Sequence, residues 1–305
     1  MSDVVHEDDT FRTMIAGAIG NMVEWYDWTV YGLMAGVFSR FIFPSDYPTT
    51  SVISALLTFA VGFSMRPIGS IVLSPLADRY GRRQILSLSI PLMGLGSLLT
   101  ALVPTYAAIG IASPIIVLVA RLLQGSSTGA AFESSMVYLV EHAAAHRRGQ
   151  VGPSQLASIG FAILVATGTA TLTILLVPQP SLAQWAWRLP FLLGAFLSLY
   201  GRWVRRRLPE THYFVAIEQR QQKARRPVLE ALRQHPKAAC TVFSVQVGTV
   251  MFYLRTVFLP TYANLVGKLP LSQGLAGGTV SLAEFTLAVP VSAGQYRRVF
   301  AARNG

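Results

Sequence analysis

Long apolar segments alternate with short polar ones along the 305 residues of this chain. A helix that crosses the hydrocarbon core of a bilayer needs roughly 20 consecutive, mostly apolar residues. The apolar segments predict about eight such spans, because each is close to that length. Their expected bounds are 12–39, 50–73, 84–104, 112–140, 151–177, 187–204, 238–262 and 273–294. We therefore expect an all-α integral membrane protein that crosses the lipid bilayer several times.

The polar segments divide the spans into units. The longest of them, 205–237, is rich in lysine and arginine and separates six spans from the rest of the chain. We expect a cytoplasmic tail at 1–11, a six-helix bundle at 12–204, a basic cytoplasmic linker at 205–237, part of a second bundle at 238–294 and an aberrant tail at 295–305. The simplest role for the linker is a solvated connection held near anionic lipid headgroups.

Lysine and arginine gather in alternate loops. The second and fourth spans are followed by Arg79, Arg82, Arg83, Arg147 and Arg148, whereas the loops between them are nearly free of basic residues. Loops rich in lysine and arginine stay in the cytoplasm, so this pattern predicts that both termini are cytoplasmic in a plasma (inner) membrane. Trp185 and Trp187 lie at the outer end of the sixth span, where tryptophans are typical of an anchor at the interface.

Composition excludes several other classes of protein. Only 13% of the residues are charged, about half the roughly 25% of a soluble domain. The formal net charge of +11 comes from short basic segments between apolar runs, so we expect no nucleic-acid partner. The single cysteine, Cys240, cannot form an internal disulfide, and no metal-ligand spacing is present. There is no phosphate-binding Walker loop and no catalytic constellation, so we expect no enzyme.

Two carboxylates interrupt the first apolar segment. Glu24 and Asp27 lie one helical turn apart, and Tyr31 follows Asp27 by another turn, so one helix face carries all three. Neighbouring carboxylates repel each other, which favours the uptake of a proton by one of them. We expect Glu24 and Asp27 to couple proton movement to transport. The alternative is that both lie near the cytoplasmic end and pair with arginines of the loops.

The second and fourth spans each contain an arginine. Arg66 stands before Pro67, and Arg121 lies one turn before Gln124 on the same helix face. A buried guanidinium keeps its charge and offers a planar set of donors that matches a carboxylate. We expect Arg121 and Gln124 to bind an anionic substrate, with Arg66 and Tyr31 as further candidates. The alternative is that these arginines join helices through an internal acid.

The loop after the second span resembles a signature of the major facilitator superfamily. The residues that match are Asp78, Arg79, Gly81, Arg82 and Arg83. Ser74 stands where the superfamily has glycine, so the helix contact there is expected to be looser. Glycine permits a tight turn between helices, and the arginines hold the loop in the cytoplasm. The resemblance implies that this segment is the gating loop of a carrier.

Further motifs resemble the metabolite:proton symporter family within that superfamily. The matching segments are Gly20–Asp27, Arg66–Gly69, Arg121–Gly125, Trp187–Phe191 and Pro209–Thr211. Segments 138–141 and 252–254 look most like the citrate and tricarballylate branch, whereas other members carry ketoglutarate, shikimate, proline or betaine. The resemblance implies proton-coupled symport of a small organic anion, such as a di- or tricarboxylate. Its partners are the anion and protons, and it needs no cofactor beyond the proton gradient.

Two departures from the family pattern bear on activity. Ala131 stands where the family has a glutamate, and an acid follows at Glu133. The family has twelve spans and repeats the signature loop after its eighth, but residues 295–305 lack the aspartate of that loop. We therefore expect a truncated chain, with a six-helix N-terminal bundle of the major facilitator type and about two helices of the C-terminal bundle. No oligomer is indicated.

Three alternatives to an anion carrier remain at this point. The first is a remnant that no longer transports, because the family's substrate site lies between two six-helix halves. The second is a symporter of an osmolyte such as proline or betaine. The third is a seven-helix receptor, which is disfavoured because the loop from Asp78 to Arg83 and the break before residue 238 would have no purpose there.

Overall fold

The computed structural model describes residues 7–80, 82–142, 148–205 and 259–270, together with 236, 240, 272–274, 276 and 280. This part of the chain is helical and contains no strand. Its long helices are α1 (Glu7–Ile42), α2 (Pro48–Tyr80), α3 (Arg82–Leu102), α5 (Ala112–His142), α6 (Arg148–Leu176) and α8 (Leu189–Arg205). Its short helices are α4 (Tyr106–Ile109), α7 (Gln179–Gln184), the 3-10 helix η2 (Ala186–Arg188) and α12 (Leu259–Leu265).

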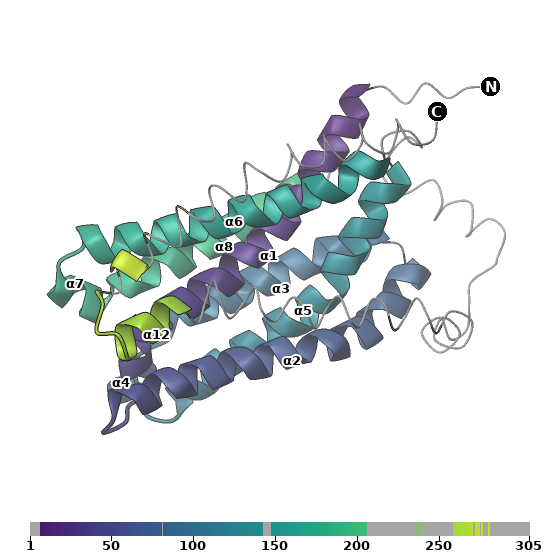
Figure 1. Ribbon diagram of the computed structural model, residues 1–305. Helices are drawn as coiled ribbons and strands as arrows, with labels where there is room; N and C mark the ends of the chain where they lie inside the picture. Colours follow the sequence, from purple (N-terminus) through teal and green to yellow (C-terminus); the bar gives the residue numbers. More distant parts are fainter. Residues whose placement is uncertain are drawn as a thin grey trace, which may run out of the picture.

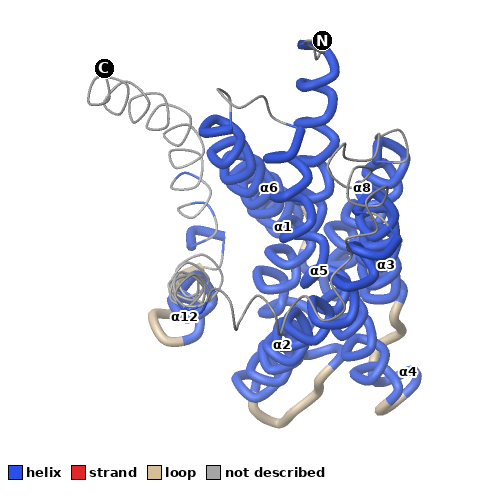
Figure 2. Tube along the Cα trace, turned by 90° about the vertical axis from the view of Figure 1, so that its right-hand side faces the viewer, coloured by secondary structure: helices blue, strands red, loops and turns tan. Residues whose placement is uncertain are grey.

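The long helices lie side by side in one bundle (Figure 1). Helix α1 runs through its middle and packs against α2, α5, α6 and α8, while α3 packs against α5 and α8. The short helices α4, α7 and α12 gather at one end of the bundle, and α12 contacts α1 there (Figures 1 and 2). Side chains on α1 therefore face several helices at once, which places any polar group on α1 within reach of the rest of the bundle.

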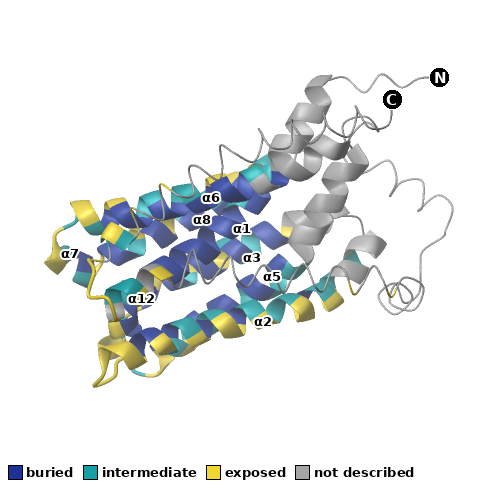
Figure 3. Ribbon diagram, in the orientation of Figure 1, coloured by how far each residue is buried: buried dark blue, intermediate teal, exposed yellow. Residues whose placement is uncertain are grey.

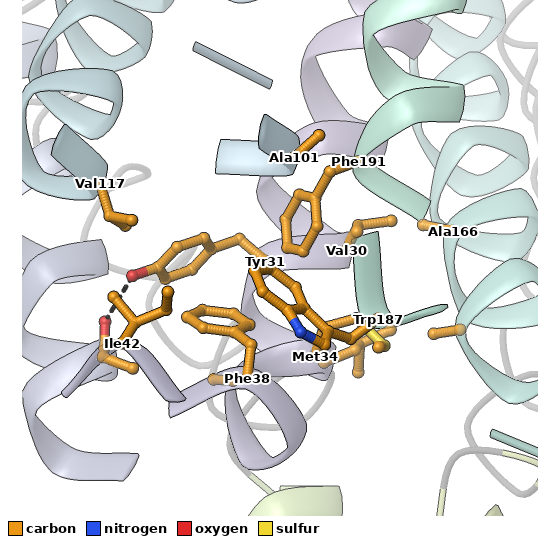
Figure 4. Close-up of a cluster of buried hydrophobic side chains, with 14 of the residues drawn as sticks. Val30, Tyr31, Met34, Phe38, Ile42, Ala101, Val117, Ala166, Trp187 and Phe191 are labelled. Carbon is orange, nitrogen blue, oxygen red and sulfur yellow. Dashed lines mark hydrogen bonds between the residues drawn. The ribbon is translucent and has the colours of Figure 1, made fainter. Parts of the chain in front are cut away.

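Aromatic rings fill the core near the end of α1 (Figure 4). Phe38 lies 5.0 Å from Tyr31, 5.7 Å from Trp187 and 5.8 Å from Phe191, measured between ring centroids. Trp187 is fully buried, whereas the nearby Trp185 is 52% exposed. The Trp187 ring packs against Phe38 and Phe191, and a large ring gains most from close contact of this kind in a core. That the two tryptophans anchor the chain at the membrane interface stays a prediction.

The outward face of α2 is apolar. Its exposed side chains include Ile53, Leu57, Val61, Ile68 and Ile71, and Figure 3 shows exposed positions along the coloured part of the helix. A continuous apolar face of this kind would be unfavourable in water and is favourable in lipid. Among the described residues, Pro48–Leu73 and Ala157–Leu176 are long and apolar enough to span a membrane, and Leu88–Leu102 is apolar but shorter.

Helices α2 and α5 approach each other so closely that only glycine fits at the contact. A Cβ atom on Gly125 would overlap the carbonyl oxygen of Gly62, and one on Gly129 would overlap the carbonyl oxygen of Arg66. The spacing of Gly125 and Gly129 is the small-residue pattern that allows helix backbones to meet in a membrane. This close contact fixes the backbones that carry Arg66 and Arg121 relative to each other.

Several predicted features lie outside the described residues. Helix α2 ends at Tyr80 and α3 begins at Arg82, but Gly81 and the side chains of Asp78, Arg79, Arg82 and Arg83 are not described. Most of the linker 205–237 and of the expected seventh and eighth spans is also outside them, and α12 falls at the end of the seventh. The prediction of a gating loop and of these unit boundaries stays a prediction.

Candidate functional site

The two acids of α1 each face an arginine on another helix. Oε1 of Glu24 lies 3.4 Å from Nη2 of Arg66 on α2, and Oδ2 of Asp27 lies 3.2 Å from Nη1 of Arg121 on α5. All four side chains are within the bundle, and only Arg66, at 18%, keeps appreciable exposure. For Asp27 the alternative of a loop arginine is therefore wrong, because its partner Arg121 lies in a neighbouring span.

Asp27 is the centre of a buried hydrogen-bond network that joins three helices. Its carboxylate accepts hydrogen bonds from Oγ of Ser97 on α3, from Nε2 of Gln124 at 2.6 Å and from Nη1 of Arg121 at 3.2 Å. Nε2 of Gln124 also lies 3.1 Å from the carbonyl oxygen of Met93. A buried charge is tolerated only when it is paired and hydrogen-bonded, and Asp27 meets both conditions.

The guanidinium of Arg121 lies over an aromatic face. Its Cζ is 4.3 Å from the centroid of the Tyr31 ring, and Nη2 is 3.4 Å from Oγ1 of Thr100. The Tyr31 hydroxyl donates to the carbonyl oxygen of Ala55 at 3.1 Å, which fixes the ring beneath the arginine. Nε of Arg121 and Oε1 of Gln124 have no hydrogen-bond partner within the described part of the chain. The site therefore holds donor and acceptor capacity that its own residues do not use.

The second ion pair is built around aromatic rings. Cζ of Arg66 lies 4.3 Å from the centroid of Phe63 and 4.9 Å from that of Trp28. Nε1 of Trp28 donates to Oγ1 of Thr128 at 3.2 Å, which holds the indole between α2 and α5. Cation–π contacts of this kind compensate part of the hydration that a buried guanidinium loses. Arg66 and Glu24 form the more accessible of the two pairs.

The two carboxylates that the sequence places on one face of α1 are paired with arginines of different helices, Glu24 with Arg66 and Asp27 with Arg121. A proton on Asp27 would remove the negative charge and leave the guanidinium of Arg121 without its counter-ion. An uncompensated charge inside a membrane protein is unfavourable and calls for another anion.

Sequence reasoning missed the contribution of α3. Ser97 and Thr100 both contact the central network, yet neither was singled out among the candidates. The available signal was the presence of hydroxyl residues one turn apart in an otherwise apolar span. Across the described residues, no group of histidine, cysteine, aspartate or glutamate side chains could hold a metal ion.

A bundle of long helices with a lipid-facing apolar surface and paired charges at its centre defines a multi-pass membrane protein of the transporter class. The model of the Sugar (and other) transporter family matches residues 13–267, and the chain belongs to this family.

Curated relatives from bacteria resemble most of the chain. It is 30% identical to the shikimate transporter of Escherichia coli, over 88% of the chain and 64% of the relative. It is 33% identical to the alpha-ketoglutarate permease of Escherichia coli, over 89% and 62%. It is 32% identical to the glycine betaine/proline/ectoine/pipecolic acid transporter OusA of Dickeya dadantii, over 87% and 55%. The chain thus spans roughly three-fifths of the length of these relatives.

Solved structures show the same fold. The partially occluded inward-open xylose transporter XylE of Escherichia coli matches with a TM-score of 0.69 at 19% identity, covering 92% of this chain and 72% of that one. The proton:xylose symporter XylE of the major facilitator superfamily, bound to 6-bromo-6-deoxy-D-glucose, matches with a TM-score of 0.70 at 17% identity, covering 92% and 69%. The prediction of an all-α fold of the major facilitator type is confirmed.

Proposed function

We propose that this chain acts in proton-coupled symport of a small organic anion, such as a di- or tricarboxylate like citrate, across the cytoplasmic membrane. The observation that carries the proposal is the buried pair of Asp27 and Arg121, which lies at the junction of α1, α3 and α5. In this proposal both termini are cytoplasmic and the loop from Asp78 to Arg83 is part of the gate.

In this proposal, proton binding and anion binding are coupled through the charge of Arg121. When Asp27 binds a proton, Arg121 loses its counter-ion, and a substrate carboxylate can take that place. Nη1 of Arg121 and Nε2 of Gln124 then donate to the substrate as they donate to Asp27 in the proton-free site. Proton binding and anion binding therefore favour each other, and the effect of one on the affinity of the other is reciprocal. Tyr31 keeps the guanidinium in place during the exchange.

The second pair fits a substrate with more than one carboxylate. Arg66 keeps 18% of its side chain exposed, and its Nε has no hydrogen-bond partner in the described residues. Protonation of Glu24 would release Arg66 for a second carboxylate in the same way. Two arginines on adjacent helices α2 and α5 would then hold a di- or tricarboxylate between them, each with its own proton-accepting acid.

Binding to the purified protein tests the substrate class. The thermal midpoint of unfolding (Tm) would be measured with citrate, alpha-ketoglutarate, shikimate, proline, betaine and xylose at pH 5.5 and 7.5. We expect a carboxylate to raise the Tm, more strongly at pH 5.5, and Arg121→Gln to remove that rise. Arg202→Gln, on α8 and away from both pairs, is the matched control and should bind as the unmodified chain does. A rise that survives Arg121→Gln would contradict the proposed role of Arg121.

An osmolyte such as proline or betaine is the second candidate substrate. It is favoured by relatives that include OusA and a proline/betaine transporter of Salmonella typhimurium, which is 30% identical to the chain. Trp28 lies 5.1 Å from Phe59 and 5.6 Å from Phe63, so aromatic faces that suit a quaternary ammonium surround the site. A Tm that rises with betaine and not with citrate would select this substrate class.

A further inference from the structure

A second buried polar cluster lies between α1 and α6, away from Asp27. Asn21 on α1 and Gln155 on α6 are each only 2% exposed, and Ser158 is 7% exposed. Nδ2 of Asn21 donates to Oγ of Ser158 at 3.0 Å and approaches the carbonyl oxygen of Gln155 at 3.4 Å. Oγ of Ser158 donates to that same carbonyl at 2.7 Å. These contacts join the Asn21 amide to Ser158 and to the backbone of Gln155 at the helix interface.

Several buried polar atoms of this cluster have no hydrogen-bond partner in the described part of the chain. Within the described residues, Oδ1 of Asn21 and both side-chain atoms of Gln155, Oε1 and Nε2, have no hydrogen-bond partner. Buried polar side chains are almost always hydrogen-bonded, because leaving one unpaired costs its full desolvation penalty. The buried amides of Asn21 and Gln155, on residues joined through the backbone of Gln155, are therefore candidates for binding a further polar group.

The chemistry of these atoms defines the ligand. Asn21, Gln155 and Ser158 are uncharged, so they offer nothing to neutralise an ion in a setting where an unpaired charge is costly. A hydroxyl group fits, because it donates to a carbonyl oxygen and accepts from an amide N–H. Ile159, Ala162 and Ile163 pack with Trp25 beside the cluster, so its surroundings are apolar.

We propose that the side-chain amides of Asn21 and Gln155 bind one hydroxyl group between α1 and α6. The hydroxyl belongs either to an ordered water, which needs two to four polar partners of this kind, or to a hydroxylated substrate. Asn21 precedes Glu24 by one turn, about 4.5 Å along the axis of α1, so the bound hydroxyl lies close to the accessible ion pair. As a water site it does not depend on the proposed roles of Asp27 and Arg121, whereas binding of a substrate hydroxyl rests on the proposed function.

Replacing Gln155 by methionine tests for water in the ligand-free protein. Methionine has nearly the same shape and no hydrogen-bonding amide, so Gln155→Met removes the ligand's partners without emptying the space. We expect the Tm to fall by roughly 2–6 °C, because the hydrogen bonds to the bound hydroxyl are lost. The same change at exposed Gln184 is the matched control and should leave the Tm within about 1 °C.

Two variants with smaller side chains at position 155 give the same test. Asparagine and leucine have the same number of side-chain heavy atoms and the same branching at Cγ, but only asparagine keeps an amide. We expect Gln155→Asn to have a higher Tm than Gln155→Leu, since the amide still holds the hydroxyl. In a dry site the order is reversed, because an unpaired buried amide is less stable than an apolar side chain.

Malate and succinate distinguish the two sources of the hydroxyl. Both are four-carbon dicarboxylates, and only malate carries a hydroxyl group. If the hydroxyl belongs to the substrate, Gln155→Met weakens malate binding about tenfold and leaves succinate binding unchanged. If it belongs to water, the variant lowers the Tm of the ligand-free protein and leaves the ratio of the two affinities unchanged.

Two results together would overturn the proposal. They are a Tm that Gln155→Met raises or leaves unchanged, and a malate-to-succinate ratio equal to that of the unmodified chain. Loss of carboxylate binding in Arg121→Gln has no bearing on either result, so failure of the hydroxyl site and failure of the transport proposal are separately visible.

Discussion

A single residue, Asp27, connects several helices of the bundle. Its carboxylate is bonded to Ser97 on α3 and to both Arg121 and Gln124 on α5, so a single side chain links three helices. The sequence placed Asp27 in a span and indicated a pathway or partner, but it could not identify the partner. Helical periodicity gives the face on which a residue lies, whereas the opposing residue depends on how the helices pack.

Removal of one partner from the ion pair of Asp27 and Arg121 should destabilise the protein. Arg121→Met leaves Asp27 charged and buried, so we expect it to lower the free energy of unfolding by about 3–5 kcal/mol. The double variant Asp27→Asn, Arg121→Met should lose much less than the sum of the single losses, because no unpaired charge remains. Unfolding in mixed micelles with increasing dodecyl sulfate measures all three variants. Additive losses would show that the two side chains do not interact.

Replacement of Arg66 should destabilise the protein less than replacement of Arg121. Arg66 is 18% exposed and Arg121 is fully buried, so water reaches the pair of Arg66 and Glu24 and weakens the attraction between their charges. We therefore expect Arg66→Met to lower the free energy of unfolding by about 1–3 kcal/mol, clearly less than Arg121→Met. The same micelle titration decides the order. A larger loss for Arg66→Met would contradict the burial that distinguishes the pairs.

At the scale of elements, most of the first six spans could be read from apolar length. The expected 84–104 is close to α3, Arg82–Leu102, and the expected 187–204 is close to α8, Leu189–Arg205. Helix α1 begins at Glu7, within the expected polar tail, because backbone hydrogen bonding does not stop where the apolar run ends. The buried face of each span was harder to identify, since lipid-facing and core-facing sides are both apolar.

The close contact between α2 and α5 should make Gly125 sensitive to substitution. A Cβ on Gly125 would overlap the carbonyl oxygen of Gly62, whereas one on Gly168 of α6 has no other atom within 4 Å. Gly125→Ala should lower the free energy of unfolding by about 1–3 kcal/mol, because the helices must separate. Gly168→Ala is the matched control and should be neutral or stabilising by up to about 1 kcal/mol. Equal effects at both positions would show that α2 and α5 do not pack this closely.

At the scale of the whole molecule, fold and site agree with membership of a transporter family. The family model covers residues 13–267, and the buried acid–arginine pairs lie within that range. Motif order and loop charge were enough to predict this fold from sequence. Substrate identity could not be predicted, because relatives of 30–34% identity have names that include shikimate, proline, betaine and alpha-ketoglutarate.

Uptake into liposomes that contain the purified chain is the most direct test of proton-coupled symport through Asp27 and Arg121. With acid outside and neutral buffer inside, we expect radiolabelled citrate to accumulate above its external concentration and to leak out when a protonophore collapses the gradient. Asp27→Asn, which mimics a permanently protonated acid, should lose gradient-driven accumulation and keep exchange of internal for external citrate. No citrate uptake under the gradient, or equal accumulation in Asp27→Asn, would contradict proton-coupled symport through this site.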